Sequence, residues 1–155
     1  MESRYRFKRG WRLELDPGVI DTFTNFRQSD ERTESGGILL GRIYEAARCI
    51  VVEVATVPNN LDQAGRYYFE RSRIAAQRIV DEQWKFSSGE RVYLGEWHSH
   101  PEPLPLPSPR DRTMIRNMFR QSKMETPYLF LVIVGVLENW VAVEDGRSLK
   151  QLECC

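Results

Sequence analysis

The segment Glu96-Trp97-His98-Ser99-His100-Pro101 carries both histidines of this 155-residue chain, two positions apart. Counting on from the second histidine, seven residues lead to Ser108, and two more lead to Asp111. Two imidazoles and one carboxylate are the ligands of a catalytic zinc site that keeps a fourth position open for water. The spacing therefore predicts a metal site with Ser108 as a neighbouring hydroxyl.

The residues before the histidines predict a strand that leads into this site. From Val92 to His98 apolar and polar residues alternate, which predicts that Val92, Leu94, Glu96 and His98 share one face. Residues two apart on a strand point the same way from origins about 6.6 Å apart, so the two histidines can converge on one ion. Glu96 is then either a hydrogen-bond partner that orients a histidine or an exposed strand residue.

The segment from Ser108 to Asp111 also has a purely structural interpretation. Ser-x-x-Asp with proline at the first helical position is typical of a helix N-terminus, where the serine caps the helix and the carboxylate lies near the positive end of the dipole. The two interpretations are compatible. A helix that begins here would hold Asp111 rigidly in front of the strand that carries the histidines.

A zinc hydrolase also needs a group that accepts a proton and returns it. Two glutamates are candidates: Glu34, which stands directly before the run Ser-Gly-Gly-Ile-Leu-Leu-Gly, and Glu31, three residues earlier. The glycines of this run form no phosphate-binding loop, since no Gly-Lys-Ser/Thr follows them.

Together, Glu34, the His98-x-His100 pair, Ser108 and Asp111 resemble the JAMM signature of the JAB/MPN metallopeptidases. The resemblance implies that the two histidines and Asp111 bind one Zn²⁺ ion per chain. It also implies that Glu34 acts as general base and then general acid, while the Ser108 hydroxyl stabilises the oxyanion.

The same resemblance implies one JAB/MPN-type domain over residues 1–155. Its class would be α/β (mixed αβα), with a curved central mixed β-sheet flanked by about three helices. At 155 residues and 41% hydrophobic content, the chain is long enough for one core and too short for two ordinary domains. Local patterns predict strands over 5–15, 38–44, 49–57, 92–98, 126–136 and 140–143, and helices over 17–27, 71–86 and 108–123.

The segments 95–102 and 68–72 resemble the bacterial branch of the family, and most closely the JAB peptidases of CBASS antiphage operons. That resemblance implies an isopeptidase that cleaves after the C-terminal glycine of a ubiquitin-like modifier, or of a cGAS-like nucleotidyltransferase, conjugated to a target. Two alternatives stay open: trimming the C-terminus of a sulfur-carrier protein, and a non-catalytic MPN scaffold. Segments 58–69 and 101–107 flank the predicted site and are candidates for lining a substrate groove.

Composition excludes several other classes. The 22 basic and 22 acidic side chains cancel, so we expect neither a nucleic-acid nor a membrane partner. Without a long apolar run or a signal-peptide core, the chain is expected to be cytoplasmic. Three cysteines make no disulfide framework. We expect Cys49 to be a small core residue, and Cys154 and Cys155 to fray.

Overall fold

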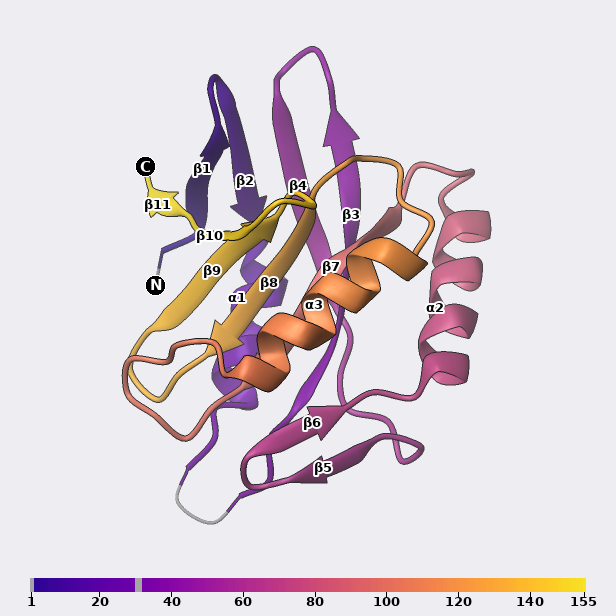
Figure 1. Cartoon of the computed structure of the whole chain (residues 1–155). Coiled ribbons are helices and arrows are strands. Elements are labelled where there is room, and N and C mark those ends of the chain that lie inside the picture. The colour runs from indigo at the N-terminus through magenta and orange to yellow at the C-terminus, as the bar shows by residue number, and fades with distance from the viewer. Residues whose placement is uncertain (1, 30–31) are drawn as a thin grey trace.

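The computed structural model describes residues 2–29 and 32–155 (Figure 1). Within these ranges it has a nine-stranded sheet, a separate two-stranded hairpin and three helices. The strands are β1 (Arg4–Lys8), β2 (Trp11–Leu15), β3 (Gly36–Tyr44), β4 (Cys49–Ala55), β5 (Gln63–Gly65), β6 (Tyr68–Glu70), β7 (Val92–Ser99), β8 (Leu129–Val134), β9 (Asn139–Glu144), β10 (Leu149–Gln151) and β11 (Glu153–Cys154). The helices are α1 (Pro17–Asn25), α2 (Arg73–Phe86) and α3 (Pro109–Gln121).

The large sheet is mixed and strongly curled. Its strand order is β10-β9-β8-β7-β3-β4-β2-β1-β11, with β2–β4 and β7–β8 parallel and the other neighbours antiparallel. The two edge strands, β10 and β11, are separated in the chain by Leu152 alone. The segment 149–154 therefore joins both edges of the sheet. The predicted mixed α/β class with a curved sheet and three helices is confirmed.

The concave side of the sheet encloses a dry core. Phe7 of β1 packs edge-on against Phe130 of β8, with ring centroids 5.2 Å apart, although these strands are far apart in the sheet order. Helix α1 inserts Val19 and Phe23 into this core, where Phe23 meets Trp97 of β7 at 5.3 Å.

The convex side is covered by α2 and α3; in Figure 1, α3 crosses in front of the sheet and α2 stands to its right. Ile115 of α3 and Ala76 of α2 pack with apolar residues of β3, β8 and β9. The same side carries the buried charged residues described below. The sheet therefore separates an apolar core from a partly polar one.

Several predicted element bounds are corrected. Segment 5–15 forms two strands rather than one, because Gly10 has a left-handed φ of 76° that allows a tight turn. Residues 63–65, for which no strand is predicted, form strand β5. Cys49 is buried as predicted. The expected fraying of Cys154 is wrong, since it pairs with Tyr5 in the sheet. No described helix has the length and apolar character needed to cross a bilayer.

Candidate functional site

Strand pairing brings the histidines next to the segment that carries Glu34. His98 of β7 lies opposite Gly36 of β3. Just beyond this pair, the Ser35 amide donates to Ser99 Oγ at 2.9 Å, and the Ser99 amide donates to the Ser35 carbonyl at 2.8 Å. Glu34 therefore enters the site from a backbone that is fixed to the strand of the histidines.

Gly36 allows this close approach. A Cβ at this position would lie 2.5 Å from the Phe69 ring and 2.7 Å from the Trp97 carbonyl oxygen, and no side chain can be accommodated at such distances. Glycine here lets the β6 hairpin pack directly over the strand that follows Glu34.

Helix α3 presents Asp111 as its N-terminal sequence predicts. Ser108 is the N-cap: its Oγ accepts from the Asp111 amide at 3.1 Å, and Asp111 Oδ2 accepts from the Ser108 amide at 2.8 Å. This reciprocal pair is a capping box, with Pro109 in the first turn. The capping interpretation is confirmed, and it leaves Asp111 facing the histidines.

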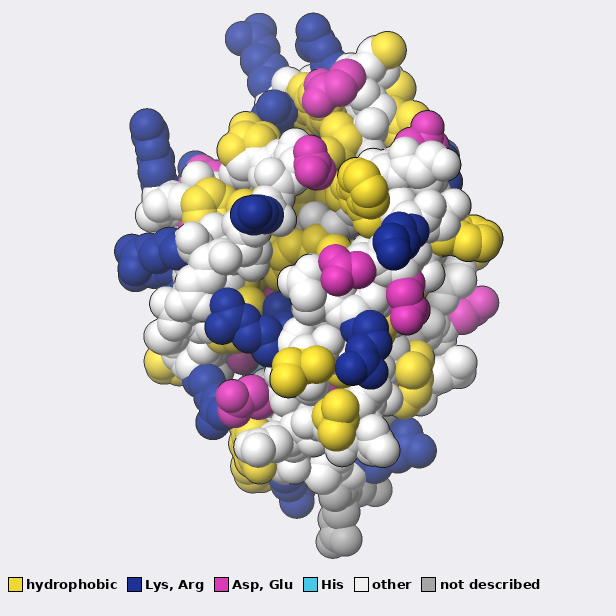
Figure 2. Space-filling view, turned by 90° about the vertical axis from the view of Figure 1, so that its right-hand side faces the viewer, with side chains coloured by type: hydrophobic (Ala, Val, Ile, Leu, Met, Phe, Trp, Pro, Cys, Tyr) yellow, Lys and Arg dark blue, Asp and Glu magenta, His cyan; other side chains and the backbone are white. Residues whose placement is uncertain are grey.

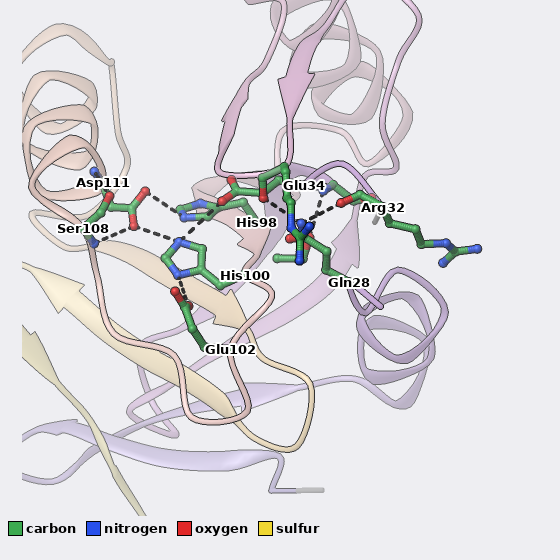
Figure 3. A network of polar contacts seen from close by, with 11 residues as sticks. Gln28, Arg32, Glu34, His98, His100, Glu102, Ser108 and Asp111 are labelled. Atoms are coloured by element: carbon green, nitrogen blue, oxygen red, sulfur yellow. Dashed lines mark hydrogen bonds and ion pairs between the residues drawn. The ribbon is translucent and has the colours of Figure 1, made fainter. Parts of the chain in front are cut away.

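Figure 3 shows four side chains from three segments converging on one point. His98 Nε2 lies 2.9 Å from Asp111 Oδ1, and His100 Nε2 lies 3.0 Å from Asp111 Oδ2. On the other side, Glu34 Oε1 lies 3.9 Å from His100 Nε2. All four residues are buried. The structure thus brings together every residue of the predicted constellation, with Ser108 adjacent to it; the competing Glu31 lies outside the described residues.

The two carboxylates of the site have opposite electrostatic environments. Burial raises the pKa of Glu34 from 4.5 to about 8, with only partial compensation by His100. Burial acts in the same direction on Asp111, but its close contacts with His100 and His98 outweigh it and hold its pKa well below the usual range. For His100 the lowering effect of burial is outweighed by Asp111, so its pKa is raised. Asp111 is thus suited to stay ionised, and Glu34 to exchange a proton.

The donor set fits a metal ion. His98 Nε2 is buried and, within the described part of the chain, makes no hydrogen bond of acceptable geometry despite its short distance to Asp111. A buried nitrogen lone pair without a donor is costly unless a cation binds it. One ligand atom each from Glu34, His98 and His100 lies within 4.8 Å of the others, and Asp111 contacts both histidines. The cluster is a candidate metal site with two possible carboxylate ligands.

Glu102 is a polar contact that the sequence interpretation missed. Its Oε2 lies 3.0 Å from His100 Nδ1. A carboxylate on the far ring nitrogen fixes the tautomer in which Nε2 keeps its lone pair for the metal. The available signal was its position two residues after His100, in the bend that follows β7.

Glu96 is hydrogen-bonded to Arg71 and Tyr93, and not to a histidine as one of its two interpretations predicted. Its Oε1 accepts from Arg71 Nε at 2.6 Å, and its Oε2 accepts from the Tyr93 hydroxyl. The alternation predicted for β7 is wrong in its first half. Leu94 has no partner on β3 between the pairs Leu40–Tyr93 and Leu39–Gly95. This β-bulge changes which side chains of β7 lie on the same face of the sheet.

A groove leads from the cluster between the β6 hairpin and α3. It has a volume of about 650 Å³ and is lined by Tyr68 and Phe69 of β6, His98, and Asp111, Met114 and Met118 of α3, among others. Figure 2 shows a hollow on this side of the molecule, with apolar side chains at its base and Lys and Arg side chains around it. Of the two segments expected to line a substrate groove, 58–69 contributes Tyr68 and Phe69, and 101–107 contributes no residue to the lining of this cavity.

A curled α/β domain with a buried His-His-carboxylate cluster at the mouth of a groove defines a candidate metal-dependent hydrolase. The prokaryotic homologs of the JAB domain (Prok-JAB) match residues 16–150 of the sequence. The chain therefore belongs to this family and is a JAMM-type metallopeptidase.

Relatives support the assignment. A protein of Pseudomonas aeruginosa named CD-NTase/cGAS isopeptidase is 34% identical over 88% of this chain and 85% of its own length. A protein of the same name from Vibrio cholerae is 31% identical over 84% and 81% of the two chains. A probable metalloprotease of Sinorhizobium fredii is 26% identical over 70% and 66%. The solution structure of a Desulfitobacterium hafniense protein superposes with a TM-score of 0.59 at 21% identity, over 90% and 88% of the two chains, and supports the fold alone.

Proposed function

We propose that this metallopeptidase is a zinc-dependent isopeptidase that cleaves after the C-terminal residue, a glycine, of a cGAS-like nucleotidyltransferase or a ubiquitin-like modifier conjugated to a target protein. It would act in CBASS antiphage defence. The observation that carries the chemistry is the buried cluster at the end of a peptide-sized groove. The names of the relatives supply the class of conjugate.

His98, His100 and Asp111 would hold the zinc ion. Asp111 is preferred to Glu34 as the third ligand because its oxygens lie 2.9 and 3.0 Å from the two Nε2 atoms, against 3.9 Å between Glu34 and His100. When bound, zinc supplies a Lewis acid that lowers the pKa of water and polarises a carbonyl group. Glu102 would orient His100 through Nδ1.

Glu34 would carry the proton. It takes a proton from the attacking water and returns it to the departing amine, so that one group serves both halves of the hydrolysis. Its backbone is held by a hydrogen bond from its amide to the Gly65 carbonyl at 2.7 Å, and its neighbour Ser35 is bonded to Ser99. These bonds fix the position of Glu34 without using its carboxylate.

Ser108 would stabilise the oxyanion. Its Oγ accepts the Asp111 amide hydrogen, which leaves the hydroxyl hydrogen available to donate to the negative oxygen that forms during attack. The capping box keeps this hydroxyl at the N-terminus of α3, where the helix dipole also favours negative charge.

The groove would hold the tail of the conjugated protein in an extended conformation. Strand β6 pairs with β5 along one edge, and its other edge has no strand partner among the described residues. A tail can add as a strand at such an edge, with its main chain supplying the affinity. Met114 and Met118 would contact the tail from the opposite wall.

The test is cleavage of a purified conjugate between a CBASS nucleotidyltransferase and its target, followed by mass spectrometry. We expect release of the intact nucleotidyltransferase with its C-terminal residue exposed, and little digestion of casein. Asp111→Asn should lose zinc, measured by elemental analysis, together with activity. Zinc-loaded protein that leaves the conjugate intact but trims a sulfur-carrier precursor would overturn the proposal.

A further inference from the structure

Arg71 occupies an unusual position for a charged residue. It links β6 to α2, and its side chain is only 13% exposed. It lines both the groove beside the metal cluster and a second cavity of about 460 Å³ between α2 and α3. Arg71 therefore lies at the boundary between the two cavities.

The guanidinium is held in one orientation. Arg71 Nε donates to Glu96 Oε1 at 2.6 Å, and one terminal nitrogen contacts the Met118 sulfur at 3.3 Å. The Tyr93 hydroxyl donates to the other oxygen of Glu96 and interacts with Arg71 as well. These contacts use at most three of the five N–H groups of an arginine, so donors remain for another acceptor.

The position of the Arg71–Glu96 pair relative to the metal cluster determines which residue of a substrate tail Arg71 would contact. Glu96 precedes His98 by two residues on β7, a distance of about 6.6 Å along a strand. An extended peptide advances about 3.3 Å per residue. A tail whose last carbonyl lies at the metal cluster would therefore reach Arg71 about two to three residues before the scissile bond.

We propose that Arg71 is a specificity-determining residue that donates hydrogen bonds to a main-chain carbonyl of the substrate tail at this position. The inference rests on the proposed isopeptidase function and deepens it. Because the carboxylate of Glu96 already offsets its charge, the remaining N–H groups are matched to a neutral acceptor rather than to a second carboxylate. Arg71 thus selects an extended main chain, whatever side chains the tail carries.

The test compares fluorogenic aminocoumarin amides of two lengths, which contain the last two or the last eight residues of a CBASS nucleotidyltransferase tail. For the wild type we expect kcat/KM to be at least about 10-fold higher for the long peptide, which is the effect of one charge-assisted hydrogen bond. The double variant Arg71→Met/Glu96→Gln removes both charges together. In this variant the ratio of kcat/KM for the long peptide to that for the short one should fall at least about 10-fold, because KM for the long peptide rises. Arg71→Lys keeps the charge but loses the planar fork, so it should lower the ratio as well.

Arg91→Lys is the matched control. Arg91 also bonds a carboxylate, Glu53, at 3.1 Å, but it lines neither cavity. The ratio of kcat/KM for the long peptide to that for the short peptide should be the same in Arg91→Lys as in the wild type. Zinc content and melting temperature of each variant separate the effect from unfolding, since a merely structural role for Arg71 would lower kcat/KM for both peptides equally.

If the ratio of kcat/KM for the long peptide to that for the short one is unchanged in folded, zinc-loaded Arg71→Met/Glu96→Gln, the inference is overturned while the isopeptidase function stands. An advantage of the long peptide that disappears when its acidic residues are replaced by alanine would show recognition of a carboxylate, and would overturn the main-chain assignment. Failure of the wild type to cleave both peptides and the conjugate would instead reject the proposed function itself.

Discussion

The two faces of the curled sheet are made by the same strands but bury different chemistry. On the concave face β7 contributes Trp97, which packs with Phe23 of α1 in an apolar core. On the convex face the same strand contributes Glu96 and His98, which are buried beside charged partners and next to open cavities. The concave face thus buries an apolar core, whereas the convex face also buries charged side chains.

This difference shows how a small domain can hold a costly site. Buried carboxylates and unpaired imidazole nitrogens destabilise the folded state. The concave core has no such groups among its buried members and supplies the compensating burial of apolar surface. We therefore expect substitutions on the two faces to separate stability from activity.

The largest effect is expected at Glu34. Glu34→Ala should lower turnover by about 10²–10⁴-fold, the usual contribution of general acid–base catalysis, because both proton transfers would depend on this carboxylate. Zinc content and melting temperature should stay close to the wild type. Steady-state kinetics on a conjugate, with elemental analysis of the same sample, would check this. Near wild-type turnover would transfer the role to another residue, with Glu31 the first to test.

On the concave face, Phe23→Ala should destabilise the protein by about 3–5 kcal/mol, because it leaves a cavity beside Trp97. Urea unfolding of the metal-free protein would measure the loss. Zinc affinity and turnover per folded molecule should be kept, since Phe23 belongs to the apolar cluster of the concave face. A variant that stays stable yet loses zinc would contradict the separation of the two faces.

Glu102 should show an intermediate effect through the metal. Glu102→Ala removes the carboxylate from His100 Nδ1 and should lower zinc affinity by about 10–100-fold, as is typical of lost partners of metal-bound histidines. Competition with a chromophoric chelator would measure it. Glu125→Ala, at an exposed position, is the control of equal charge. Equal affinities in the two variants would remove Glu102 from the site.

The smallest effect concerns stability without metal. The folded pKa of Glu34 is about 8, above its ordinary value of 4.5, so the folded state binds this proton more tightly and loses stability as pH rises between the two values. In chelator-treated protein, Glu34→Gln should therefore be more stable than the wild type at pH 8, by about 1 kcal/mol after allowance for solvent screening. The difference should vanish below pH 4.5. Urea titrations at both pH values would test it, and a gain that is largest in acid would have the wrong sign.

The site was predictable because its spacing fixes its geometry. The His-x-His pair on an extended segment and the Ser-x-x-Asp helix start place their side chains by local rules alone. All of these residues, with Glu34, converge in the structure. The roles assigned to them remain predictions.

The features that could not be predicted from the sequence depend on contacts between segments that are distant in the chain. The bulge at Leu94 arises in the pairing of β7 with β3, and it moves Tyr93 onto the face of Glu96. The buried pair of Arg71 and Glu96 joins residues 25 positions apart. The short strands β5, β10 and β11 have too few residues to show an alternation, so only their partners define them.

The closure of the sheet by residues 149–154 has a consequence for association. Unpaired strand edges template pairing between molecules and lead to aggregation. Here β10 covers part of β9, and β11 covers part of β1, while the Leu152 side chain is buried in the concave core and its amide donates to the Val141 carbonyl at 2.8 Å. One short segment thus protects both flanks of a nine-stranded sheet from self-recognition. The proposed strand addition of a substrate tail would therefore occur at the edge of β6 that has no strand partner among the described residues, rather than at the large sheet.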